Sequence, residues 1–113
     1  MGAAADPEIE EKIKKFLLKR NDIEKVTSFR TEILGPGRLR LASEIEFHGE
    51  ALINKEKLSE DAEKIRSGEE DPFPILVDTS ERMVRTLGKV INELEAALKK
   101  EFPQLDIIEL EVN

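Results

Sequence analysis

Residues 38–47 of this 113-residue chain read RLRLASEIEF, which is the clearest alternation of apolar and polar side chains in the sequence. The residues on one side of this alternation are Leu39, Leu41, Ser43, Ile45 and Phe47. A period of two predicts a β-strand with one buried face and one polar face. The fold class follows from this strand, because the segments around it must supply its neighbours and cover its apolar face.

The segments on both sides carry the signals of further strands. Residues 24–34 alternate apolar or threonine side chains with polar ones, and Gly-Pro-Gly at 35–37 supplies a turn. Two strands joined by so short a loop form an antiparallel hairpin. A last strand is predicted at 105–112, where apolar residues are mixed with Glu109 and Glu111. We therefore expect a sheet of three strands.

Three helices are predicted from apolar residues at helical spacing. The first covers 7–20 and begins at Asp6-Pro7, an N-cap followed by a residue well suited to the first helical position. The second covers 54–66 and the third covers 78–102. The third carries an apolar stripe that we interpret as core: Val84, Leu87, Ile91, Leu94, Leu98 and Phe102.

Proline and glycine shape our interpretation around the third helix. The sequence DPFP at 71–74 is expected to interrupt a helix, so residues 68–77 are predicted to form a loop. Gly88 lies inside the helix, where glycine costs about 1 kcal/mol against alanine. It indicates a close backbone contact, and the alternative is a tolerated surface glycine. The order of elements gives an α+β sandwich, a three-stranded sheet with helices on one face.

Composition excludes several classes of function. The formal net charge of −7 argues against nucleic-acid binding, which needs a basic surface. The chain has no cysteine and a single histidine, so thiolate zinc sites and cysteine nucleophiles are absent and most serine–histidine chemistry is excluded. No catalytic constellation is recognised, and we expect no enzymatic activity.

The sequence also lacks the signals of membrane insertion and export. No apolar run approaches the roughly 18 residues that a membrane helix needs. The start, MGAAA, is small and uncharged and does not fit a signal peptide. We interpret residues 1–6 as a cloning or linker remnant and residues 7–113 as one domain, in which 54–77 form an inserted helix and loop.

Four local patterns then point to a known family. They are VTSFR at 26–30, EIEF at 44–47, LKKEFP at 98–103 and IELE at 108–111. In this order, with the glycine turn after the first strand, they resemble the C-terminal domain of cation diffusion facilitators, which export zinc-type divalent cations. The Phe47-His48-Gly49 corner and the extra segment resemble most the branch that contains the mitochondrial zinc transporters.

The resemblance implies both a fold and a role. The fold is an αββ(α)αβ metallochaperone-like or ferredoxin-like two-layer sandwich. The role is that of a cytosolic dimerisation and regulatory domain of a zinc-type efflux transporter. Its partners would be a second copy and the membrane part of the same protein. The chain would then be a soluble tail of an integral membrane protein, on the cytoplasmic or organelle-matrix side of the host membrane.

The metal site of the family is altered in this sequence. Metal-binding members carry histidines at the places that become Thr27, Glu44 and Glu109 here, while Glu111 keeps the acidic position. Zinc favours imidazole and thiolate, and all-oxygen sites suit harder ions. The resemblance therefore implies a degenerate tail zinc site, no required cofactor and, at most, a weak divalent-cation site.

Two interpretations of the site residues stay open. Glu44, Glu109 and Glu111 form a carboxylate cluster for a divalent ion if their strands are neighbours, or else a solvated sheet face balanced by arginines. His48 is either a metal ligand beside the glutamates or a turn histidine. The alternative function is a stand-alone ferredoxin-like regulatory domain with a concave apolar ligand pocket.

Overall fold

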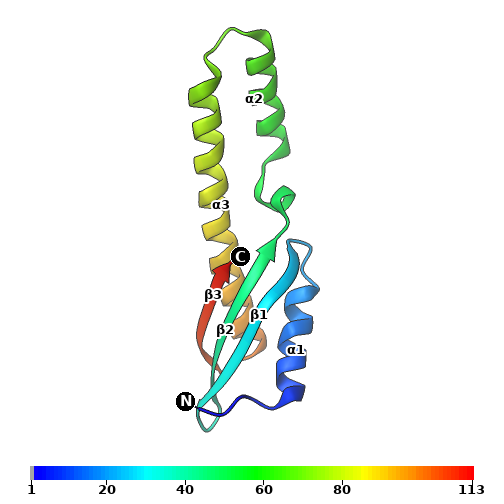
Figure 1. The fold of residues 1–113 in the computed structure, drawn as a ribbon, viewed down its shortest axis with the longest axis vertical. Helices are drawn as coiled ribbons and strands as arrows, with labels where there is room; N and C mark the ends of the chain where they lie inside the picture. The colour runs from blue at the N-terminus through cyan, green and yellow to red at the C-terminus, as the bar shows by residue number, and fades with distance from the viewer. Residues whose placement is uncertain (1) are drawn as a thin grey trace.

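The computed structural model describes residues 2–113 as a three-stranded sheet, two helices that cover it and a projecting helical hairpin (Figure 1). The helices are α1 (Pro7–Leu18), the 3₁₀ turn η1 (Gly49–Leu52), α2 (Lys55–Ser67) and α3 (Pro72–Glu101). The strands are β1 (Ile23–Gly35), β2 (Arg38–Phe47) and β3 (Leu105–Val112). The predicted α+β class and the order of elements are confirmed.

The sheet has the order β1-β2-β3, with β2 in the centre. β1 and β2 form the predicted antiparallel hairpin, and β3 returns parallel to β2 after the crossover through α3. The alternation predicted for residues 38–47 is confirmed, because Leu39, Leu41, Ser43 and Ile45 are all buried. β2 is therefore the strand that carries the centre of the core.

β1 departs from a simple alternation at a β-bulge. Val26 pairs with Ile45 and Ser28 pairs with Glu44, which leaves Thr27 without an opposite residue. The extra residue shifts the side-chain phase, so that Val26 and Phe29 both pack against the core and Thr27 is exposed.

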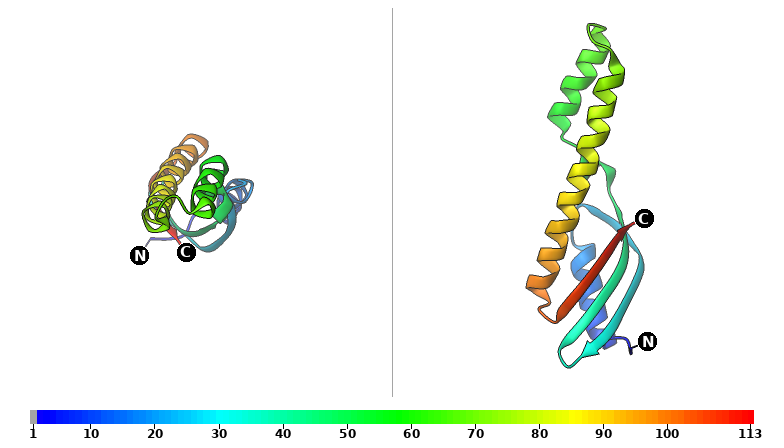
Figure 2. Two further views of the ribbon diagram at one scale, coloured as in Figure 1. Left: turned by 90° about the horizontal axis from the view of Figure 1, so that it is seen from above. Right: turned by 90° about the vertical axis from the view of Figure 1, so that its left-hand side faces the viewer.

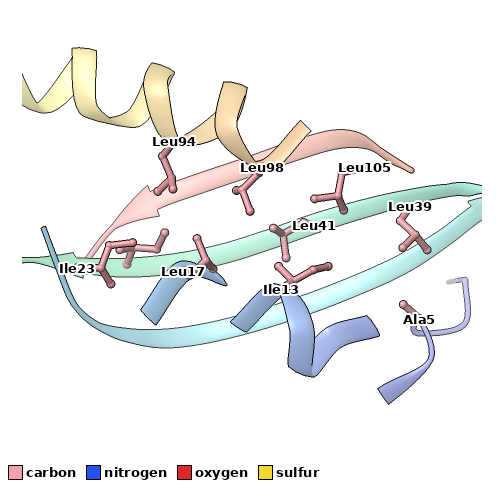
Figure 3. Close-up of a cluster of buried hydrophobic side chains, with 10 residues drawn as sticks. Ala5, Ile13, Leu17, Ile23, Leu39, Leu41, Leu94, Leu98 and Leu105 are labelled. Carbon is pink, nitrogen blue, oxygen red and sulfur yellow. The ribbon is translucent and has the colours of Figure 1, made fainter. Parts of the chain in front are cut away.

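The core lies between the sheet and the two helices that cover its apolar face. Figure 3 shows Ile13 and Leu17 of α1 and Leu94 and Leu98 of α3 converging on Leu41. The rings of Phe16 and Phe102 add an edge-to-face contact between the two helices, with centroids 5.7 Å apart. These apolar side chains stabilise the sandwich by removing their surface from water.

The predicted loop at residues 68–77 is wrong, because α3 already begins at Pro72. Asp71 caps the helix by accepting a hydrogen bond from the amide of Phe73 at 3.1 Å. Pro72 and Pro74 fall in the first turn, where backbone amides have no intrahelical partner to lose. The prolines therefore start the helix, and only Gly68, with φ of 71°, ends α2 as predicted.

The early start of α3 creates a feature that the sequence interpretation had not included. α2 and the N-terminal half of α3 form a hairpin that projects beyond the sheet, as the right-hand view of Figure 2 shows. The molecule measures 62 × 22 × 22 Å as a result. No helix within residues 2–113 is long and apolar enough to cross a membrane.

The segment before α1 lies against the edge of β1. The amide of Ile33 donates to the carbonyl of Ala3 at 2.7 Å, and the amide of Ala5 donates to Thr31 Oγ1 at 2.9 Å. Ala5 is buried among the core residues. The visible N-terminus thus lies at the end of the molecule opposite to the tip of the α2–α3 hairpin (Figure 1).

Candidate functional site

The three predicted glutamates lie on the face of the sheet that no helix covers. β2 and β3 are neighbours, and Glu44 is the direct cross-strand partner of Glu111. Glu109 pairs with Ala42, one step along the same face. The structure therefore brings Glu44 and Glu111 side by side and places Glu109 next to them.

Two of these carboxylates have hydrogen-bond partners, one an arginine and the other a threonine. Arg40 donates to both oxygens of Glu109 at 2.8 and 2.9 Å, and this bond raises the pKa of Arg40 above its usual range. Thr27 Oγ1 lies 3.4 Å from a carboxylate oxygen of Glu44. The family positions Thr27 and Glu44 thus meet, whereas Glu109 turns to an arginine.

A second arginine–carboxylate pair completes the charge pattern of this face. Arg38 donates to Asp106 at 2.5 Å and lowers the pKa of that carboxyl. Both side chains are about half exposed, and exposed pairs of this kind contribute about 0–1 kcal/mol each. The outer face is therefore a surface of alternating charges with one carboxylate pair, Glu44 and Glu111.

His48 lies beyond the end of β2. It precedes η1 without a capping bond from its side chain, and its backbone amide donates to the carbonyl of Asp22 at 2.9 Å. Within residues 2–113, no three or more histidine, aspartate or glutamate side chains form a group that could hold a metal ion. The structure thus places His48 in no such group with the glutamates.

The apolar stripe of α3 is only partly core. Leu94 and Leu98 are fully buried, as predicted, but Val84 is 70% exposed, so its assignment to the core was wrong. The close backbone contact predicted at Gly88 is wrong too, because Gly88 is exposed and a Cβ at this position would meet no atom within 4 Å. Thirty residues of helix extend about 45 Å, whereas the ten residues of β2 extend about 33 Å, so the sheet cannot cover the whole helix.

The uncovered part of the stripe lies on the projecting hairpin. We call it the exposed stripe and define it as Phe73, Val77, Ser80 and Val84. These residues recur at intervals of four, three and four, and Leu87 and Ile91 continue the same spacing toward the sheet. Such a repeat is the seam of a helix that packs on another helix.

A cluster of hydrogen-bonded polar side chains, which we call the polar clasp, joins α2 to α3 on a different side of α3 from the exposed stripe. Arg82 of α3 donates to the buried Asp61 of α2, to Thr79 Oγ1 at 3.2 Å and to Asp78 at 3.0 Å. Lys57 Nζ lies 3.7 Å from Asp61. Burial alone would raise the pKa of Asp61, but the hydrogen bond from Arg82 and the nearby cations lower it, so the carboxylate is ionised at neutral pH.

A hollow of about 690 Å³ lies beside the turn between β1 and β2. Its lining is mostly apolar and includes Ala5, Ile9, Ile33 and Leu39. The charged groups at its rim are Asp6 and Arg38. The hollow has the apolar character that the alternative ligand-binding function requires, and few polar groups converge on it to orient a ligand.

Comparison with known proteins relates the whole chain to parts of two longer proteins, a metal tolerance protein and a zinc antiporter. Metal tolerance protein C4 of Arabidopsis thaliana is 23% identical over 122 residues, which cover 100% of this chain and 27% of that protein. The mitochondrial proton-coupled zinc antiporter SLC30A9 of Homo sapiens is 22% identical over 120 residues, covering 99% of this chain and 21% of that protein. No protein-family model and no solved structure matches. The chain is thus similar, from end to end, to about a quarter of the length of each of these two proteins.

Proposed function

We propose that the chain is a non-catalytic dimerisation domain of a divalent-cation transporter of the cation diffusion facilitator kind. The similarity to a metal tolerance protein and to a zinc antiporter over the full length of the chain supports this assignment. The αββ(α)αβ order and the four sequence patterns agree with it. The domain would hold two transporter copies together on the cytoplasmic or organelle-matrix side, and the pore would lie elsewhere in the longer protein.

The exposed stripe is the observation that carries the proposal. Phe73 and Val84 are each 70% exposed, although apolar side chains of this size gain free energy when they are removed from water. The hairpin that bears them has a polar clasp on its inner side. An apolar seam on a projecting hairpin is best explained by a partner that covers it.

A second copy of the chain fits the stripe better than the membrane part of the same protein. Residue 2 lies at the opposite end of a molecule that is 62 Å long (Figure 1). A membrane part that precedes the domain would therefore lie far from the stripe. Two copies in one membrane run in the same direction, so a two-fold axis along the molecule sets each residue of the stripe beside its own copy.

The residues of the stripe favour this parallel pairing. Val77, Val84 and Ile91 occupy one position of the seven-residue repeat, and β-branched residues at that position favour two-stranded parallel coiled coils. The sheet covers the same stripe farther along α3, where Leu94 and Leu98 are buried. The two helices must therefore diverge toward the sheets, and the contact is confined to the hairpins.

A contact of this length gives a weak dimer. The span from Phe73 to Val84 extends about 17 Å along the helix. Tethering in one membrane raises the effective concentration to about the millimolar range, so a dissociation constant of about 10–100 μM suffices for pairing. The pairing needs no metal, because the carboxylates of the outer face lie on the sheet and not on the hairpin.

Light scattering combined with zinc calorimetry tests the proposed function. We expect a dimer at about 0.5 mM protein and no zinc binding tighter than about 0.1 mM, which corresponds to about −5.5 kcal/mol. The two glutamates Glu44 and Glu111 provide oxygen ligands only, which zinc binds poorly without imidazole or thiolate. A chain that stays monomeric at this concentration, or one that dimerises only after zinc is added, would contradict the proposal.

A further inference from the structure

A second recess lies where the projecting hairpin joins the sheet domain. It has a volume of about 390 Å³ and is bounded by η1, the first turn of α2 and the middle of α3. This size falls within the range of about 300–1,000 Å³ that is usual for small-molecule sites. The recess is distinct from both the outer face of the sheet and the exposed stripe.

All charged side chains that line the recess are cationic. Lys57 comes from α2, and Arg82, Arg85 and Lys89 come from α3. This is unexpected in a chain whose formal net charge is −7. The neighbouring Asn54 and Thr86 add polar groups to the lining. The recess therefore concentrates positive charge in an otherwise acidic protein.

The carboxylates around the recess neutralise these cations only in part. Asp61 lies behind the lining, where it binds Arg82 and approaches Lys57 at 3.7 Å. Arg85 has one loose ion pair, with Nη1 3.8 Å from Glu81. No carboxylate among residues 2–113 lies within ion-pair distance of Lys89. Two of the four cations are thus available to a ligand.

Their spacing along α3 makes an anionic ligand favourable. Arg82, Arg85 and Lys89 lie three and four residues apart, so their charges share one face of the helix. Like charges at this spacing destabilise a helix, and an anion between them removes that repulsion. Guanidinium groups also donate paired hydrogen bonds that match the oxygens of a phosphate.

We propose that this recess binds a phosphate group, either as free phosphate or as the phosphoryl end of a small metabolite. Arg85 and Lys89 supply the direct contacts from α3, and Lys57 closes the site from α2. Because the site joins residues of both helices, the bound anion also links α2 to α3 at the base of the hairpin. Phosphate binding is independent of the proposed dimerisation, so the two proposals fail or succeed separately.

NMR titration of the ¹⁵N-labelled chain tests this site. Sodium phosphate is added at neutral pH and compared with sodium chloride at equal ionic strength. We expect saturable shifts of the Asn54 and Thr86 amides, with a dissociation constant of about 1–10 mM, a range typical of weak small-ligand sites. Equal shifts in the phosphate and chloride titrations would overturn the proposal. Shifts that are confined to other parts of the chain would also overturn it.

Two double variants separate a specific site from general charge attraction. Arg85→Gln with Lys89→Gln should weaken phosphate binding at least about tenfold, since each removes a charge-assisted hydrogen bond. Arg82 is kept, because it holds α2 through Asp61. The matched control, Lys99→Gln with Lys100→Gln, removes the same charge from the same helix outside the recess and should change binding less than about twofold. Equal weakening by both double variants would refute the site.

Discussion

Replacing Val84 with glutamate is expected to convert the dimer into a monomer and to raise its dissociation constant at least about 100-fold, equivalent to about 2.8 kcal/mol. Val84 is the residue of the exposed stripe nearest the sheet, and it is 70% exposed in the single chain. In the parallel dimer it faces its own copy, so the variant sets two carboxylates against each other away from water. Burying unpaired charges costs several kcal/mol. Sedimentation equilibrium at about 0.1–1 mM protein measures the change, because this range lies at or above the dissociation constant of about 10–100 μM expected for the wild type, which is then largely dimeric.

The control for this variant lies on the same helix. Ala96 is exposed and lies outside the stripe, so Ala96→Glu adds the same charge without entering the seam. We expect it to leave the dissociation constant within about threefold of the wild-type value, as surface substitutions away from special features change free energies by about 0.5 kcal/mol or less. Circular dichroism should show that both variants keep the helical content. Equal dimerisation of Val84→Glu and the wild type would show that the seam is not the contact.

Replacing Leu98 with alanine should lower the free energy of unfolding by about 3 kcal/mol, within the 2–5 kcal/mol measured for buried leucines. Leu98 is fully buried between α3, α1 and the centre of the sheet (Figure 3). The loss combines the transfer of the deleted methyl groups with the cavity that they leave. A domain of this size is stable by about 5–15 kcal/mol, so the variant should unfold at a clearly lower urea concentration.

Leu76→Ala provides the matched comparison for the core. Leu76 lies on the same helix but on the hairpin, where 55% of its surface is exposed. We expect it to cost less than about 1 kcal/mol, because more than half of the surface of Leu76 stays in water on folding. Urea unfolding followed by circular dichroism, at a protein concentration below the dissociation constant, measures both variants. A loss below 1 kcal/mol for Leu98→Ala would contradict the described core.

The sheet could be predicted because its pattern is local. Apolar and polar residues alternate over the ten residues of β2, and a Gly-Pro-Gly turn precedes this strand. Pro103, after α3, marks where β3 begins. The phase of β1 could not be derived in the same way. The bulge at Thr27 depends on how β1 pairs with β2, and an isolated strand does not show where an extra residue lies.

The start of α3 shows that proline can either end or begin a helix, depending on its position. Proline ends a helix when it falls in the interior, but it is favoured in the first turn. Asp71 before Pro72 is the same N-cap and proline pair that starts α1 at Asp6, and it was the available signal. Because the Asp71-Pro72 pair was read as part of a loop, the sequence predicted neither the hairpin nor the exposed stripe.

The sequence identified the glutamates of the candidate site but did not show which of them lie side by side. The sequence assigned Glu44 to one strand and Glu109 and Glu111 to another, and it left open whether these strands are neighbours. The pairing of β2 with β3 answers that question. Which carboxylates would be held by arginines depends on the strand register, and the parallel pairing sets Glu109 within reach of Arg40. The recess proposed to bind phosphate was not predicted either, because its cations come from two helices whose facing sides are set by how the hairpin packs.

Cysteine cross-linking at Ser80 tests the proposed pairing most directly. The chain contains no cysteine, so a single Ser80→Cys substitution reports one contact without ambiguity. The parallel seam sets residue 80 beside its own copy, within the Cα separation of about 4.4–6.8 Å that a disulfide needs. Mild oxidation should therefore yield a covalent dimer, while Ser59→Cys on the exposed surface of α2 should stay monomeric. No cross-link at Ser80, or equal cross-linking at both positions, would contradict dimerisation through the exposed stripe.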